Sequence, residues 1–213
     1  MAAPYRGRLL HRHRKFRDQI RTRGTTTGST GSTRWEPLVQ TDTAGGSNRT
    51  ATFLLMVSTV LVGLMAGLFF AFDVSVMPGL ARGDERTYVT AMQNFNAVID
   101  GNGLFGTVFV VALLAAVASA AVEFRKGRRG VAVWVGAAAA LYLVVLVITF
   151  TVNIPLNNEL ADAGDAAKLT DFSIVDKFKG TWVTTNIIRT LLCTAALTAL
   201  ARALVLYGRA TAR

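Results

Sequence analysis

The chain has 213 residues, of which 52% are hydrophobic, and its mean hydropathy is +0.40. These values are typical of an integral membrane protein and exclude an ordinary soluble domain. The formal net charge is +10, and the single cysteine, Cys193, excludes an intramolecular disulfide and a multi-cysteine metal site. Both histidines, His11 and His13, precede the first apolar run, so we expect no haem and no histidine-ligated metal within the membrane. We also expect that the protein uses no cofactor.

Residues 1–50 differ in composition from the rest of the chain. They contain the arginine-rich stretch RGRLLHRHRKFRDQIRTR and the low-complexity linker GTTTGSTGST. Neither stretch can bury enough apolar surface to fold alone, so we predict a disordered cytoplasmic tail. Because this tail lies beside a membrane span, its positive charge favours anionic lipid as the partner, and we expect no nucleic acid.

Four apolar runs follow, and each is near or above the length that crosses a bilayer. They comprise residues 52–72, 104–122, 131–152 and 182–207. We therefore predict an all-α membrane protein, in which a bundle of four transmembrane helices occupies residues 51–210. Small residues, such as Gly63 and Gly67 in the first run, allow the helix backbones to approach closely.

The distribution of charge between the runs predicts the orientation of the bundle. The loop EFRKGRRG, residues 123–130, has four basic residues and one acidic residue. Residues 73–103 carry two basic and four acidic residues, and residues 153–181 carry three and five. Basic loops remain in the cytoplasm. We therefore expect a multi-pass protein of the cell membrane, with both termini inside and the two longer loops outside.

The two longer loops contain amphipathic segments. In the first, Asp84 is expected to cap a helix that runs to about Ile99. Helical spacing gives this segment an apolar face and a polar face. The apolar face has Tyr88, Met92, Phe95 and Ile99, and the polar face has Gln93, Asn96 and Asp100. An interfacial helix that lies on the bundle and a cap whose amides line a pocket both fit this pattern. In the second loop, we expect Pro155 to end the third span.

Arg189 is a charge inside the fourth apolar run. Trp182, Asn186, Arg189 and Cys193 are separated by four, three and four residues, so they share one helix stripe. If Trp182 marks the outer interface, Arg189 lies about 10 Å deeper. A charge there costs roughly 2.5 to 3.5 kcal/mol unless it is paired or hydrated. Asp73, at the end of the first span, is the obvious acidic partner. A structural ion pair and a cationic pocket floor are both compatible with the sequence.

Four motifs follow one another along the chain: GLFFAFDVSVMPGLA, AMQNFNAVI, NIPLNNEL, and a Trp, an Asn and an Arg at the start of the last span. Together they resemble the anthrone-oxygenase-like family of integral membrane proteins, over about residues 55–207. The resemblance implies a four-helix membrane protein. Most bacterial members have no assigned function, whereas the assigned fungal members are oxygenases that convert polyketide anthrones to anthraquinones without metal or flavin.

Carried over residue by residue, the resemblance implies a set of substrate-binding residues. This set is Phe70, Gln93, Asn96, Asn153, Asn157 and Trp182. An anthrone is a carbon acid whose carbanion can react directly with oxygen, so the protein need only remove a proton and stabilise an enolate. Asp73 is the candidate general base, and Arg189 with Asn186 is the candidate enolate stabiliser. A direct ion pair between Asp73 and Arg189 would compete with both roles.

Two functions therefore fit the sequence. One is a cofactor-independent oxygenase that acts on a lipophilic aromatic or enolisable substrate. The other is a non-enzymatic membrane protein that binds a small molecule or lipid, or serves as an accessory subunit. The sequence has no inverted repeat and no chain of intramembrane acids, which disfavours an ion-coupled transporter. Four helices of this size are also compatible with a homodimer, which the sequence does not decide.

Overall fold

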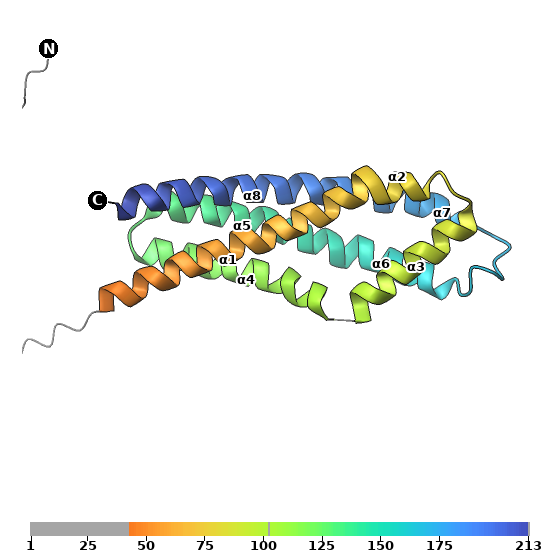
Figure 1. Ribbon diagram of the computed structural model, residues 1–213, viewed down its shortest axis with the longest axis horizontal. Helices are drawn as coiled ribbons and strands as arrows, with labels where there is room; N and C mark the ends of the chain where they lie inside the picture. Colours follow the sequence, from red (N-terminus) through yellow and green to blue (C-terminus); the bar gives the residue numbers. More distant parts are fainter. Residues whose placement is uncertain (1–42, 102, 213) are drawn as a thin grey trace, which may run out of the picture. The chain divides into compact units, whose positions relative to one another are not determined.

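A computed structural model of the protein describes residues 43–101 and 103–212. The basic tail predicted for residues 1–50 lies mostly outside these residues. The described part is helical and contains no strand (Figure 1). Its α-helices are α1 (Thr43–Ala71), α2 (Met77–Leu80), α3 (Glu85–Gly101), α4 (Leu104–Arg125), α5 (Arg129–Ile148), α6 (Ile154–Asp162), α7 (Ser173–Lys177) and α8 (Val183–Thr211). Three short π-helical segments join some of them, namely η1 (Phe72–Val76), η2 (Thr149–Asn153) and η3 (Phe178–Trp182).

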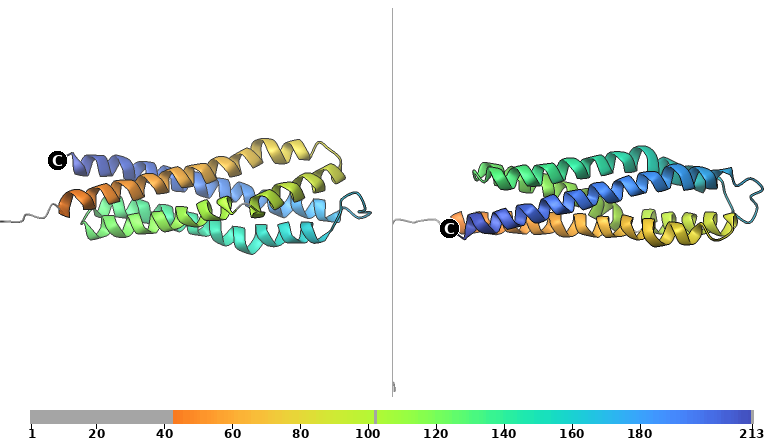
Figure 2. Two further views of the ribbon diagram at one scale, coloured as in Figure 1. Left: turned by 60° about the horizontal axis from the view of Figure 1, so that its bottom comes forward. Right: turned by 90° about the horizontal axis from the view of Figure 1, so that it is seen from above.

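Four continuous helices in the described residues are long and apolar enough to cross a membrane. They are Arg49–Leu80, Leu104–Arg125, Arg129–Asp162 and Ser173–Thr211. α1 and α5 each pack against both α4 and α8, which makes a four-helix bundle (Figure 2). The predicted fold class is therefore confirmed. The helix that begins at Thr43 starts eight residues before the expected boundary of the membrane domain.

Pro155 does not end the third membrane helix, contrary to the expectation from sequence. The helix continues from α5 through η2 and α6 to Asp162. A proline has no N–H to donate to the preceding turn, and its ring crowds the carbonyl of that turn. A π-helical turn widens the helix at such a point, so the chain can remain helical. Pro78 lies just after η1 in the same way that Pro155 lies just after η2.

The core of the bundle contains small residues between larger apolar ones. Ala112, Ala138, Ala196 and Ala203 are fully or almost fully buried at the helix contacts. Large apolar side chains lie on the outer surface instead, for example Leu114, which is 59% exposed. Lipid gives no hydrophobic drive for helix pairing, so close contact between small residues stabilises the bundle.

The predicted helix between the first two spans is present as α3. The backbone N–H of Thr87 donates to Asp84 Oδ1 at 2.9 Å, which is the expected N-cap. This hydrogen bond lowers the pKa of Asp84. The buried face differs from the expected one, because Asn96 is buried and Phe95 is 39% exposed. The helix therefore directs a polar residue toward the bundle.

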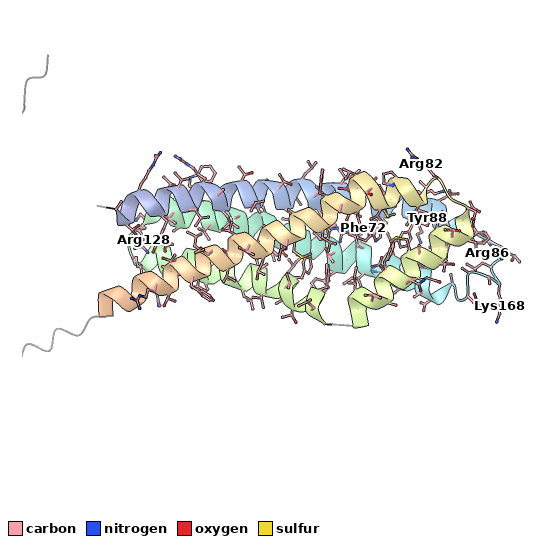
Figure 3. All side chains as sticks on the ribbon, in the orientation of Figure 1. Phe72, Arg82, Arg86, Tyr88, Arg128 and Lys168 are labelled. Carbon is pink, nitrogen blue, oxygen red and sulfur yellow. The ribbon has the colours of Figure 1, made fainter. Side chains whose placement is uncertain are left out.

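α2, α3, α6 and α7 enclose a second apolar core at one end of the bundle. Tyr88, Val89 and Met92 of α3 pack there with Leu160 and Phe178. Figure 3 shows Phe72 and Tyr88 toward this end and Arg128 at the opposite end. We call the first the capped end and the second the Arg128 end.

The Arg128 end is held together by a buried ion pair. Arg128 donates to both carboxylate oxygens of Glu123, which is fully buried, and one of these bonds, from Nη2 to Oε1, is 2.8 Å long. The same guanidinium lies over the ring of Tyr207, 5.1 Å from its centroid. The hydroxyl groups of Tyr207 and Thr52 are hydrogen-bonded at 2.8 Å. These contacts join α1, α4 and α8 through the loop before α5.

Candidate functional site

A partly open cavity of about 230 Å³ lies at the capped end of the bundle. Parts of α1, η1, α3, α4, η2, α6, η3 and α8 contribute to its walls. Its apolar lining is mainly aromatic and includes Phe69, Phe72, Phe105, Phe109, Phe150 and Trp182. All three π-helical segments of the described chain contribute residues to this cavity, and such segments are frequent at functional sites.

The guanidinium of Arg189 lies in this cavity, and the side chain is only 3% exposed. It lies over the rings of Phe69 and Trp182, 4.4 and 5.4 Å from their centroids. Its Nη1 donates to Thr149 Oγ1 at 3.2 Å, and its Nη2 donates to Asn186 Oδ1 at 2.8 Å. Its Nε has no partner in the described structure. The guanidinium of Arg189 is therefore stabilised by cation–π contacts and neutral hydrogen-bond acceptors, and not by a direct ion pair with a carboxylate.

Arg189 does not form the ion pair with Asp73 that the sequence allows. The ion pairs found among the described residues join Arg128 to Glu123 and Lys177 to Glu159. The positive charge of Arg189 is therefore available for an anionic group that enters the cavity.

Asn186 connects Arg189 to Asp73. Its Nδ2 donates to the carbonyl of Phe69 at 2.9 Å and to Asp73 Oδ1 at 2.5 Å, while its Oδ1 accepts from Arg189. The orientation of the amide follows from its partners, because a carbonyl and a carboxylate can only accept and a guanidinium can only donate. Thr190 donates its hydroxyl to the other oxygen of Asp73.

Asp73 itself does not line the cavity. Both of its carboxylate oxygens accept hydrogen bonds from α8, one from Asn186 and one from Thr190. This placement disagrees with the role of general base expected from the sequence. Asp73 is better described as a positioning residue, because it holds the amide that holds Arg189.

Asn153, which lines the cavity, has a buried acceptor without a partner in the described structure. Its Nδ2 donates to Thr185 Oγ1 at 2.9 Å and to the carbonyl of Trp182 at 3.5 Å. Its Oδ1 is buried and has no partner in the described structure. Asn96 of α3, which also lines the cavity, has a buried Nδ2 without a partner in the described structure. The residues that line the cavity therefore carry both donors and an acceptor without partners in the described structure.

Trp182 is held in place by contacts on several sides. Its Nε1 donates to Asn157 Oδ1 at 2.9 Å. Its ring stacks on Phe178 with a centroid distance of 5.9 Å and lies 5.9 Å from the ring of Phe72. A rigid indole therefore forms one wall of the cavity beside Arg189.

A family model described as anthrone oxygenase matches residues 95–199. This match supports the assignment of the chain to the anthrone-oxygenase-like family. No curated protein and no solved structure matches the chain. The part that matches the anthrone oxygenase family extends from α3 into α8, so it contains Asn96, Asn153 and Arg189 but not Asp73.

The structure brings together six of the nine residues that the sequence nominates for an anthrone-oxygenase-like site. These are Asn96, Asn153, Asn157, Trp182, Asn186 and Arg189, which all line the cavity. Phe70 is 56% exposed on the outer surface, because it follows Phe69 on the helix and points about 100° away from it. Gln93 lies outside the cavity and donates to the carbonyls of Leu160 and Gly164 at 2.8 and 2.9 Å. It fastens α3 to the end of α6.

Several residues of this anthrone-oxygenase-like site were not among the site residues nominated from the sequence, although Asp100 was placed on the polar face with Asn96. Asp100 is an exposed carboxylate on the cavity lining, and Thr149 is the hydroxyl that accepts from Arg189. Helical spacing gave a signal for both residues. Asp100 is four residues after Asn96 and Thr149 is four residues before Asn153, so each shares a helix face with a nominated residue. The phenylalanines of the wall had none, because apolar spacing does not distinguish a cavity wall from a lipid-facing surface. Within the described residues, no group of histidine, cysteine and carboxylate side chains could hold a metal ion.

Proposed function

We propose that the protein is a cofactor-independent oxygenase that acts on a lipophilic aromatic or enolisable substrate bound in the cavity. The observation that carries this proposal is the environment of Arg189. A guanidinium that is 3% exposed, lies between aromatic rings and has no carboxylate partner is a site for an aromatic molecule with an anionic oxygen. The match to the anthrone oxygenase family supports the same class of substrate.

The chemistry requires the chain to stabilise an enolate. A methylene between two aromatic rings loses a proton, and the electron pair delocalises onto the oxygen across the ring. The carbanion then reacts with O₂, and the overall change converts CH₂ and O₂ to C=O and H₂O. A donor placed where the oxyanion develops is worth about 10²–10³ in rate. Arg189 can supply this donor because its Nε is free.

Asp100 is the proposed proton acceptor. It is a carboxylate on the cavity lining, whereas both oxygens of Asp73 are engaged by neighbouring side chains. The residues that line the cavity include no histidine. We expect Asp100→Asn to lower the rate of turnover and to leave the affinity for a substrate analogue nearly unchanged.

We propose that the capped end faces the outside of the cell. The loop at the other end contains Arg125, Lys126, Arg128 and Arg129, and basic loops remain on the cytoplasmic side. In this orientation both termini are cytoplasmic, and the basic residues lie next to anionic lipid of the inner leaflet. Cysteines introduced into the loop that follows α6 should then react with an impermeant maleimide in intact cells.

Oxygen uptake tests the proposed activity. The full chain in lipid nanodiscs is mixed with anthrone, and both O₂ consumption and anthraquinone are measured against empty nanodiscs. We expect wild-type turnover above this background and a loss of about 10²–10³ in the Arg189→Met variant. Uptake equal to that of empty nanodiscs would contradict the oxygenase proposal.

A non-enzymatic binding role is the second candidate. It is favoured by one observation. Asp100, the acidic residue of the cavity lining, is exposed, whereas the buried polar groups of the lining are amides, a hydroxyl and a guanidinium. These groups can bind a ligand but are poor bases. Thermal stabilisation by anthrone under nitrogen, without consumption of anthrone in air, would favour this role.

A further inference from the structure

We infer that the cavity selects a ligand that carries a free hydroxyl in addition to the oxygen bound by Arg189, and that Asn153 is the residue that selects this hydroxyl. The inference rests on the proposed function, since it concerns the substrate of the same site. The inference goes beyond the proposed function because it assigns a residue that determines specificity and a second polar group on the ligand.

The orientation of the Asn153 amide is fixed by its surroundings. The carbonyl of Trp182 can only accept, so the group that approaches it at 3.5 Å is the Nδ2 of Asn153. Thr185 points its own hydroxyl hydrogen toward the carbonyls of Thr181 and Trp182, at 2.9 and 3.0 Å, so its oxygen accepts from the same Nδ2. The carbonyl oxygen of the amide is therefore directed away from these partners.

This carbonyl oxygen is left for a ligand. Asn153 is 1% exposed and lines the cavity, and its Oδ1 has no partner in the described structure. A buried acceptor without a donor is unfavourable, so a group that donates to it binds in preference to one that cannot. Hydroxyl and N–H groups donate, whereas an ether or a methyl group does not.

Two other residues that line the cavity have unpartnered polar atoms with the opposite requirement. Arg189 Nε and Asn96 Nδ2 are both donors without a partner in the described structure. They need acceptors, which the ionised oxygen of the ligand supplies. A ligand with only this oxygen satisfies the donors but leaves Asn153 unsatisfied. An aromatic molecule with a separate hydroxyl satisfies both kinds of group.

The test measures binding under nitrogen, so that turnover does not interfere. The probes are anthrone and the monohydroxyanthrones, each of the latter paired with its methyl ether. The full chain is placed in nanodiscs, and Kd is obtained from quenching of tryptophan fluorescence, since Trp182 lines the cavity. For at least one pair, we expect the wild type to prefer the hydroxyl compound by about tenfold.

Two variants of Asn153 separate selection from a structural role. Asn153→Leu removes the acceptor, and we expect this variant to bind the hydroxyl compound and its methyl ether with about the same Kd. Asn153→Asp keeps an acceptor at the same place, and we expect the preference to be retained. Thr185→Val removes the oxygen that accepts from Asn153 Nδ2, and it should weaken the preference for the hydroxyl compound. This variant keeps the inference testable if Asn153→Leu does not fold.

Three outcomes would overturn the inference. They are a wild type that binds every hydroxyl compound and its ether equally, a preference that survives in Asn153→Leu, and a preference that is lost in Asn153→Asp. Failure of the proposed function gives a different result, because parent anthrone then shows no binding that depends on Arg189. If anthrone binds through Arg189 but no pair is discriminated, only the role of Asn153 is wrong.

Discussion

Replacement of Asn186 by leucine should weaken both the bundle and the site. The side chain of Asn186 makes hydrogen bonds to the Phe69 carbonyl, to Asp73 and to Arg189. Leucine has a similar volume but cannot make any of them. The substitution therefore removes two of the hydrogen bonds between α8 and the first membrane helix, and it also removes the amide oxygen that accepts from Arg189.

The magnitude follows from these three bonds. Two of them cross between helices, and such a bond within a membrane contributes about 0.6 kcal/mol on average and about 1.7 kcal/mol at most. The pair therefore accounts for about 1–3 kcal/mol. The substitution also leaves the buried Arg189 Nη2 and the half-buried Asp73 Oδ1 without these partners, which adds to the loss. We expect the free energy of unfolding to fall by about 3 kcal/mol.

Reversible unfolding in mixed detergent micelles measures this change, and anaerobic binding of anthrone measures the effect on the site. Thr198→Val is the control, because Thr198 is exposed on the same helix and bonds only to the carbonyl of Thr194. We expect the control to stay within about 0.5 kcal/mol of the wild type. If Asn186→Leu has the same free energy of unfolding and the same affinity for anthrone as the control, the proposed connection between Asp73 and Arg189 is refuted.

Three further changes test other parts of the structure. Gly106 lines the cavity, and a Cβ added there meets no atom within 4 Å, so Gly106→Trp should reduce the affinity for anthrone at least tenfold. Gly136→Trp is the control, because Gly136 is equally unobstructed but lies outside the cavity, and it should not reduce this affinity. Equal effects of the two variants would contradict the assigned position of the cavity. Tyr88→Phe should leave the melting temperature unchanged or raise it, because the Tyr88 hydroxyl is buried without a partner in the described structure. Burial raises the pKa of Tyr88 from 10 to about 12, so wild-type stability should fall as the pH rises from 10 to 12, and the phenylalanine variant should lose less; identical alkaline curves would disprove this. Glu123→Ala leaves Arg128 without its buried partner and should cost about 3 kcal/mol in chemical unfolding, whereas a loss below 1 kcal/mol would show that the pair is not structural.

Some of the site could be predicted from helical spacing alone. Asn186 and Arg189 follow Trp182 at four and seven residues, so any helix through this segment presents them on one stripe. The N-cap at Asp84 was also predictable, because the preference of aspartate for this position is local. Such features depend on one segment of the chain and need no knowledge of its neighbours.

The features that the sequence left open, and those that it predicted wrongly, depend on contacts between segments. The sequence left open whether Asp73 pairs with Arg189 or leaves it available for a ligand, and the structure places Asn186 between them. The buried face of α3 includes Asn96 instead of Phe95, because the helix borders a cavity that accommodates an amide. Pro155 predicted a helix end, whereas η2 lets the chain remain helical. The sequence has no local signal for these choices.

The central claim is that Arg189 binds and stabilises an anionic aromatic oxygen. Its most direct test is the visible absorption spectrum of anthrone bound to the full chain under nitrogen near pH 7, because the anthrone anion absorbs at longer wavelength than the neutral form. We predict that the wild type shows the band of the anion and that Arg189→Met, at the same occupancy, does not. A spectrum of neutral anthrone with the wild type, or an anion band that persists in Arg189→Met, would contradict the claim.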